Sequence, residues 1–284
     1  MVFDCNLCLQ GGAMRSVFTD GVLDCLIDNN ILFKNIYGIS ASSKDMFYYA
    51  AMDKESAYKA NILCATDPNT FNMSNALLGK PVINTKYYIE EIRNKKYPYN
   101  LDKITKSGIN LYIGCTNIDS MSIEYFKAPC DNLDLKIEAS CSLPVIQPII
   151  EIDNKRYLDG GIVENIPLSE ALKNNKKIIV VTTREKGFKS IESQTSAIEN
   201  QFIKMTYQDN QALVNKLLNR NNDYDKELNH LDKLEENGEV FVIRPSVAPN
   251  ISRLERDTNK LKELYQDGYN TMLKNLEKLF SYLK

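Results

Sequence analysis

The first 185 or so residues alternate short apolar runs with amphipathic segments, and this alternation restricts the fold more than any other feature of the chain. The apolar runs at Val2–Leu9, Asn110–Cys115 and Lys177–Thr183 are typical of buried strands. Apolar residues at helical spacing over Val17–Asn29, and again from Lys44, predict helices between them. Strands that alternate with helices form a mostly parallel sheet with helices on both faces. We therefore expect an α/β fold.

The last third of the sequence differs, because helical patterns dominate it. We predict a long helix over Ile198–Leu218, a single strand at Glu239–Ile243 and a final helix with an apolar stripe over Leu261–Leu283. Such a stripe belongs more often to a helix packed on a core than to one on a membrane surface. We expect an α/β core over residues 1–193 and a helical extension over residues 194–284, packed together as one structural domain.

Composition and charge narrow the classes of partner. Hydrophobic residues make up 43% of the chain and charged residues 25%, as in an ordinary globular protein. The formal net charge is -2 and the pI is near 5.7, so no basic field favours nucleic acid. No stretch approaches the roughly 18 apolar residues of a membrane-spanning helix, and we expect no secretory signal at the N-terminus.

The seven cysteines are an odd number and lack the paired spacing of a disulfide framework. Cys5 and Cys8 form a CxxC, but both lie in a predicted strand, where residues three apart face opposite sides of the sheet. We therefore interpret the cysteines as reduced, buried apolar residues, and we expect a cytoplasmic location.

Three short segments carry residues suited to catalysis, and the first is Gln10–Arg15. It contains Gly11-Gly12 between a predicted strand and a predicted helix. Residues without bulky side chains let the backbone turn sharply and expose its N–H groups at a helix N-terminus. Such a loop binds a phosphate, holds an oxyanion or is a plain tight turn. The glycine patterns of dinucleotide sites and P-loops are both incomplete here.

The second segment is Gly38–Ser42, at another junction of strand and helix. A serine lifted on a sharp turn between small neighbours is typical of the nucleophile elbow of hydrolases. The full elbow pattern is G-x-S-x-G, and Ser42 stands where the last glycine belongs.

The third segment is Asp159-Gly160-Gly161, which follows a predicted strand pair at residues 149–158 that turns at Asp153-Asn154. A strand end would present the carboxylate, and the two glycines leave space beside it. On its own, this aspartate could equally cap a turn.

Taken together, the three segments predict a serine hydrolase site. A serine is a weak nucleophile until a base accepts its proton, and its oxyanion needs donors. Ligands of α/β sheets bind at the carboxyl ends of the strands, so a donor loop, Ser40 and Asp159 can converge there.

The ordered set resembles bacterial patatin-like phospholipases, whose pattern is G-G-G-x-R, then G-x-S-x-G, then D-G-G or D-G-A. Residues 10–15, 38–42 and 159–161 match in this order, and the likeness extends over about residues 4–183. The resemblance implies a three-layer α/β/α fold. It also implies hydrolysis of acyl esters by a serine–aspartate dyad, with neither a cofactor nor a metal.

The same resemblance assigns a role to each matching residue. Ser40 attacks the ester carbonyl and Asp159 accepts its proton and returns it to the leaving alcohol. The oxyanion hole falls to the segment around the two glycines and to the residue after the nucleophile, namely Gly11, Gly12, Ala13, Arg15 and Ala41. Arg15 supports this loop or holds an anionic head group. The implied partner is a lipid or another acyl ester, with peripheral contact to a membrane.

Two departures from the family pattern bear on activity. Ala13 replaces the third glycine of the loop, where a Cβ costs about 1–2 kcal/mol if φ is positive. Ser42 replaces the second glycine of the elbow, where a helix packs closely on a strand. The alternative is a protein with weak or lost catalysis that binds fatty acids or phospholipids.

Other readings of the sequence involve different residues. A Ser-Asp-His triad could use His230, the only histidine, although its neighbours are those of a solvated helix or turn. A nucleotide-binding α/β protein is a further alternative. Met46–Tyr49 could line an acyl channel, but we expect most of them in the core.

Overall fold

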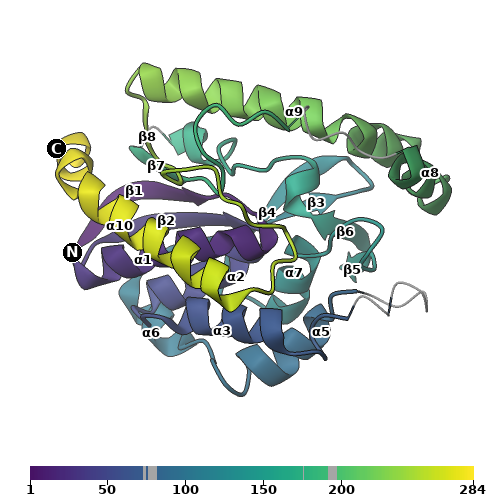
Figure 1. Ribbon diagram of the computed structural model, residues 1–284, viewed down its shortest axis with the longest axis horizontal. Helices are drawn as coiled ribbons and strands as arrows, with labels where there is room; N and C mark the ends of the chain where they lie inside the picture. Colours follow the sequence, from purple (N-terminus) through teal and green to yellow (C-terminus); the bar gives the residue numbers. More distant parts are fainter. Residues whose placement is uncertain (73–74, 76–81, 175, 191–196) are drawn as a thin grey trace.

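The computed structural model describes residues 1–72, 75, 82–174, 176–190 and 197–284. One sheet lies between two layers of helices (Figure 1). This architecture confirms the predicted α/β/α fold with a mostly parallel central sheet.

The sheet has the strand order β5-β6-β3-β2-β1-β7-β8, and β4 pairs with β3 outside this path. In the part of the sheet ordered β3-β2-β1-β7-β8, all neighbouring strands are parallel. Strands β4 and β6 both pair antiparallel with β3. The strands are β1 (Val2–Leu9), β2 (Leu32–Ile39), β3 (Asn110–Asn117), β4 (Ser122–Ala128), β5 (Ile150–Ile152), β6 (Lys155–Asp159), β7 (Ile178–Val181) and β8 (Val240–Ile243). The sequence patterns had indicated all of these except β4.

A ladder of three side-chain amides, two buried and one partly buried, links the central strands. Asn6, Asn35 and Asn110 are register partners on β1, β2 and β3. The Asn35 amide donates to the Asn6 side-chain oxygen at 3.0 Å, and the Asn110 amide donates to that of Asn35 at 2.8 Å. A slip of one residue would separate these amides and leave the buried Asn6 and Asn35 without these partners, so the ladder favours the observed register.

Helices cover both faces of the sheet. On one face α1, α2, α3 and α10 pack together, and α9 lies across the other (Figure 1). The α-helices are α1 (Val17–Asp28), α2 (Ala41–Ala50), α3 (Ser56–Thr66), α5 (Thr85–Tyr87), α6 (Leu101–Ser107), α7 (Leu133–Ser140), α8 (Ala197–Thr206), α9 (Gln211–Glu236) and α10 (Thr258–Leu283). Short 3-10 or π-helical turns are η1 (Ala13–Ser16), η2 (Tyr88–Arg93), η3 (Gly160–Ile162) and η4 (Ala171–Asn174).

The final helix, α10, packs on the α/β core, as its apolar stripe predicts. Leu261, Leu264, Met272 and Leu279 are buried in the main hydrophobic cluster. In the part of the chain that the structure describes, none of the helices has the length and apolar composition of a membrane-spanning segment.

The predicted helix over Ile198–Leu218 was wrong, because the structure breaks it in two. Helix α8 ends at Thr206 and α9 begins at Gln211. Asn210 is the N-cap of α9: its side-chain oxygen accepts from the Leu213 N–H at 3.0 Å, while its amide donates to the Ile118 carbonyl. The predicted domain boundary at residue 193 lies outside the described residues.

The cysteines are all free thiols. Cys5 and Cys8 belong to different hydrophobic clusters on opposite faces of the sheet, as predicted for a strand. The prediction that all seven are buried was wrong for Cys64, Cys130 and Cys141, which are partly exposed.

Candidate active site

Ser40 stands on a sharp turn between β2 and α2. Its backbone has φ +56° and ψ -131°, which is unusual for a residue with a side chain. A Cβ on Gly38 would lie 2.8 Å from the Ser42 carbonyl oxygen and from the Ser43 Cα, so the strand needs a glycine where α2 folds back over it. This geometry is that of the predicted elbow.

Asp159 reaches Ser40 because two strands meet end to end. Along one edge of β3, β2 pairs as far as Gly114 and β6 begins its pairing at the next residue, Cys115, which is opposite Asp159. Because β6 runs in the opposite direction to β2, the last residues of the two strands lie next to each other. The Ser40 hydroxyl donates to Asp159 Oδ2 at 2.6 Å.

Glycines beside Asp159 permit this meeting of strands. A Cβ on Gly160 would lie 2.5 Å from the Gly114 carbonyl oxygen. The Gly161 N–H donates to Asp159 Oδ1 at 2.8 Å, so each carboxylate oxygen has a partner. The carboxylate is thereby fixed with Oδ2 toward the Ser40 hydroxyl.

Burial controls the basicity of Asp159. The side chain is almost completely buried, which disfavours its charged form and raises its pKa from the ordinary value to about 6. Hydrogen bonds from Ser40 and Gly161 oppose this shift, and so does the positive charge of Arg253. The result is a carboxylate more basic than an exposed one and still ionised at neutral pH.

The loop from Gln10 to Arg15 lies against Ser40. A Cβ on Gly11 would lie 2.8 Å from the Ser40 Cβ, so the loop passes Ser40 too closely for a residue with a side chain. Among the described residues, the N–H groups of Gly12 and Ala13 have no acceptor. These two donors are therefore free to bind a group beside Ser40.

The two departures from the family pattern have structural consequences. Ala13 has φ +49°, so its Cβ does carry the strain expected of a left-handed residue. Ser42 is fully buried, and its hydroxyl donates to the Gln10 carbonyl at 2.7 Å. Ser42 thus ties the elbow to the loop, a link that a glycine could not make.

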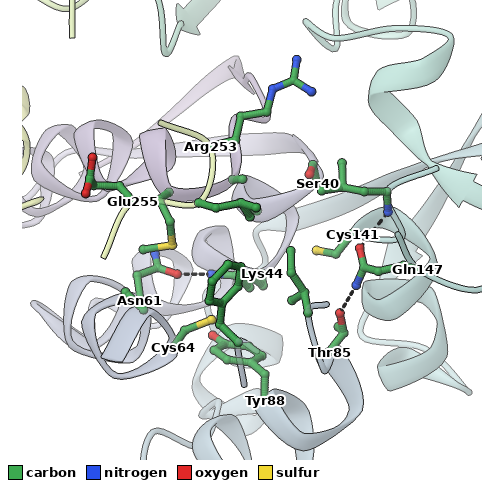
Figure 2. A pocket seen from close by; sticks show the side chains of 18 of the residues that line it. Ser40, Lys44, Asn61, Cys64, Thr85, Tyr88, Cys141, Gln147, Arg253 and Glu255 are labelled. Carbon is green, nitrogen blue, oxygen red and sulfur yellow. Dashed lines mark hydrogen bonds between the residues drawn. The ribbon is translucent and has the colours of Figure 1, made fainter. Parts of the chain in front are cut away.

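Two pockets meet at Ser40, and they differ in polarity. The first is lined mainly by apolar and weakly polar side chains, including Met14 and Phe71. Figure 2 shows Cys64 and Tyr88 in this lining, together with the charged Lys44, Arg253 and Glu255. The second also contains Asp159 and is lined by polar side chains that include the arginines Arg15, Arg220 and Arg253.

Sequence reasoning missed the contribution of the C-terminal third to these pockets. One face of α9 presents Leu217, Arg220, Asn221 and Tyr224 to the polar pocket, and Arg253 borders both pockets. The four residues are spaced so that they lie on one side of a helix, and three of them are polar. This pattern is visible in the sequence and could have indicated a polar face on α9.

Several residues considered from the sequence lie outside the site. His230 is exposed on α9 and borders neither pocket at Ser40. The Asp159 carboxylate receives its hydrogen bonds from Ser40 and Gly161, so the structure gives the triad no support. Met46–Tyr49 are buried in the core and line neither pocket.

Comparison with known proteins supports the resemblance to patatin-like phospholipases that the sequence motifs indicate. The family model for patatin-like phospholipase matches residues 7–172, which include the loop, Ser40 and Asp159. The chain belongs to the patatin-like phospholipase family. A second model, a domain of unknown function (DUF6363), matches residues 210–284 of this patatin-like protein.

Individual relatives are distant. The uncharacterized protein YjjU of Escherichia coli K12 is 26% identical over 180 residues, covering 62% of this patatin-like chain and 50% of YjjU. The chain therefore spans about half the length of that relative. The probable lipid hydrolase 463L of invertebrate iridescent virus 6 is 25% identical over 201 residues, covering 63% of this chain and 69% of the viral protein.

The crystal structure of VipD from Legionella pneumophila has a similar fold. The TM-score is 0.53 at 14% sequence identity, and the match covers 97% of this chain and 67% of VipD. At this identity the likeness concerns the fold alone, and it includes the C-terminal third of the patatin-like chain.

Proposed function

We propose that this protein hydrolyses the acyl esters of lipids through a Ser40–Asp159 dyad. The observation that carries the proposal is the 2.6 Å hydrogen bond from the Ser40 hydroxyl to the buried Asp159 carboxylate, at the point where an apolar and a polar pocket meet. The family match and the relative named as a lipid hydrolase agree with this substrate class.

The first step is attack on the ester carbonyl. Asp159 accepts the Ser40 proton as the Ser40 oxygen bonds to the carbonyl carbon. The free N–H groups of Gly12 and Ala13, with that of Ala41 at the start of α2, would hold the oxyanion. The Arg15 side chain lies in the polar pocket at the end of the same loop.

The second half of the reaction releases first the alcohol and then the fatty acid. Asp159 gives the proton to the leaving alcohol, which departs and leaves an acyl group on Ser40. Asp159 then takes a proton from a water molecule whose oxygen bonds to the acyl carbon, and it returns this proton to the Ser40 oxygen as the acyl–Ser40 bond breaks and the fatty acid is released. No step requires a cofactor or a metal.

The division of the site suggests how an ester lies in it. The acyl chain would occupy the apolar pocket, because burial of its methylene groups is favourable there. The alcohol portion would then extend into the polar pocket. Contact with a lipid surface follows from this substrate class, and it stays a prediction, as does a cytoplasmic location.

We prefer hydrolysis to the alternative function, in which the protein binds lipids without cleaving them. A binding protein would need neither a hydroxyl bonded to a basic carboxylate nor unpaired N–H donors beside it. The departures at Ala13 and Ser42 leave all of these groups in place.

Hydrolysis of a medium-chain p-nitrophenyl ester tests the proposal. We expect turnover by the wild type and its loss in Ser40→Ala, which removes only one oxygen atom. Ser281→Ala makes the same change on the surface of α10 and serves as the control. Full turnover by Ser40→Ala would refute the proposal.

The pH dependence of kcat/KM should report Asp159. Only the carboxylate form accepts a proton, and burial raises the pKa of Asp159 to about 6. We expect kcat/KM to rise with pH through about 6 and to level off above it. A profile measured with the same ester that stays flat down to pH 4.5 would exclude Asp159 as the base.

A further inference from the structure

The C-terminal region that matches the domain of unknown function, residues 210–284, borders the polar pocket. In this region α9 lies across the face of the sheet opposite α10 (Figure 1). One of its pocket-lining side chains, Tyr224, is hydrogen-bonded to the start of the loop from Gln10 to Arg15. The C-terminal region therefore contacts the loop whose free N–H groups lie beside Ser40.

Gln10 begins this loop, and its side chain joins two other elements. Its amide NH₂ donates to the Tyr224 hydroxyl, and its side-chain oxygen accepts from the Thr183 N–H at 2.9 Å. Thr183 follows the end of β7, whereas Tyr224 lies within α9. Because Gln10 is only 3% exposed, these two partners determine where its side chain lies.

The backbone carbonyls at the start of the loop are held as well. The Ser42 hydroxyl donates to the Gln10 carbonyl at 2.7 Å. The Thr183 hydroxyl donates to the Gly11 carbonyl at 3.1 Å. A Cβ on Gly12 would lie 2.7 Å from Thr183 Oγ1, so the loop lies directly against the end of β7. The path of the loop thus depends on side chains outside it.

The C-terminal region holds the loop on both sides of its free donors. Tyr224 holds Gln10 before them, and the Arg253 carbonyl accepts from the Met14 N–H at 3.2 Å after them. Between these two attachments lie the N–H groups of Gly12 and Ala13, which have no acceptor in the described part of the chain. Movement at either attachment would redirect these N–H groups.

The backbone of Ala13 makes the two attachments more important. Its φ of +49° is unfavourable for a residue with a Cβ, at a cost of about 1–2 kcal/mol. Such a conformation persists only where the surrounding contacts determine it. A loop released at one end would relax toward an ordinary φ and turn its donors away. Donors stabilise an oxyanion best when they are fixed in place before the reaction.

We propose that Tyr224 is a positioning residue for the oxyanion hole: through Gln10 it keeps the N–H groups of Gly12 and Ala13 directed at the oxyanion. The inference rests on the proposed function, because that function assigns these two N–H groups to the oxyanion. It gives the region of unknown function a role in the chemical step.

Kinetics of Tyr224→Phe test this role. The substitution removes the hydroxyl and keeps the ring, which lies near the Phe188 ring. With a medium-chain p-nitrophenyl ester, we expect kcat to fall about tenfold and KM to change less than about twofold. The rise of kcat/KM with pH should stay at about 6, since Asp159 is unchanged. An unchanged kcat, or an effect on KM alone, would overturn the positioning role.

Tyr265→Phe is the matched control. It removes a partly buried tyrosine hydroxyl that donates to Asp24 at 2.7 Å, and Tyr265 lines neither pocket at Ser40. This variant loses a comparable hydrogen bond and should keep the wild-type kcat. An equal fall of kcat in both variants would mean a general loosening of the fold and would overturn the specific role of Tyr224.

Inhibition by octyl trifluoromethyl ketone tests the oxyanion hole itself. The Ser40 oxygen bonds to the ketone carbon as Asp159 accepts the proton, and the ketone oxygen becomes an oxyanion. Methyl octyl ketone, which adds serine poorly, measures binding of the same chain. We expect Tyr224→Phe to weaken inhibition by the fluorinated ketone about tenfold and to leave that by methyl octyl ketone unchanged. Equal weakening for both ketones would overturn the proposal.

Ser40→Ala separates this inference from the function on which it rests. Without the Ser40 oxygen, the fluorinated ketone should bind no more tightly than methyl octyl ketone. Wild-type inhibition of turnover that survives in Ser40→Ala would refute the proposed hydrolase. Wild-type kcat and inhibition in Tyr224→Phe, with both lost in Ser40→Ala, would refute only the positioning role.

Discussion

Asp159→Asn is expected to lower kcat for ester hydrolysis by about 10²–10⁴-fold while the protein stays folded. The Gly161 N–H will hold the amide oxygen where Oδ1 now lies, so the amide NH₂ will face Ser40. An amide cannot accept the Ser40 proton, and its N–H would donate to the hydroxyl. Steady-state kinetics with a p-nitrophenyl ester measure the loss.

The stability of Asp159→Asn should increase, although its kcat decreases. The raised pKa means that the folded state binds the Asp159 proton more tightly than the unfolded state does. Ionisation of this group therefore lowers wild-type stability as pH rises from about 4 to 6, by a total on the order of 3 kcal/mol. Asp159→Asn removes that cost.

At pH 8 we therefore expect Asp159→Asn to melt at the wild-type temperature or above it. Asp119→Asn makes the same chemical change at an exposed carboxylate and should retain full turnover. Wild-type turnover by Asp159→Asn would contradict the assignment of the base. A much lower melting temperature would contradict the account of its burial.

Gly268→Leu is expected to destabilise the fold by about 3 kcal/mol or more, because α1 and α10 cross in backbone contact. A Cβ on Gly268 would lie 2.0 Å from the Phe18 carbonyl oxygen, and a Cβ on Gly21 would lie 2.0 Å from that of Tyr265. Within a helix, glycine is ordinarily less stable than other residues. At this crossing, by contrast, a side chain would force the helices apart.

Urea unfolding monitored by circular dichroism measures the effect. Lys274→Leu places the same side chain on the exposed face of α10 and should change stability by less than about 1 kcal/mol. Equal stability of Gly268→Leu and the wild type would show that the two helices are not in contact at these glycines.

The sequence indicated Ser40 and Asp159, which the structure brings within hydrogen-bond distance, because each lies in a short segment with its own local signal. Gly38 marks the turn before Ser40, and Gly160 and Gly161 mark the space beside Asp159. Such steric requirements are local, so a single sequence displays them. The strand pair at residues 149–158 was predicted for the same reason, and Asp153 and Asn154 have the positive φ values of a tight hairpin turn.

Long-range pairing was beyond the reach of sequence patterns. Nothing in Lys155–Asp159 indicates that this strand meets the end of β2, a placement that depends on register with β3. The same applies to Arg253, because its place in the polar pocket follows from the packing of α10 and from the hydrogen bond to Met14. The break between α8 and α9 was missed because the helical pattern continues across Asn210.

Covalent trapping with a long-chain fluorophosphonate tests the central claim most directly. The reagent reacts with an activated serine, and mass spectrometry of the intact and digested protein locates the adduct. The account predicts one adduct, on Ser40, that forms together with loss of esterase turnover, forms more slowly in Asp159→Asn and is absent in Ser40→Ala. Complete loss of turnover with the adduct on another residue, or turnover that survives full modification of Ser40, would contradict it.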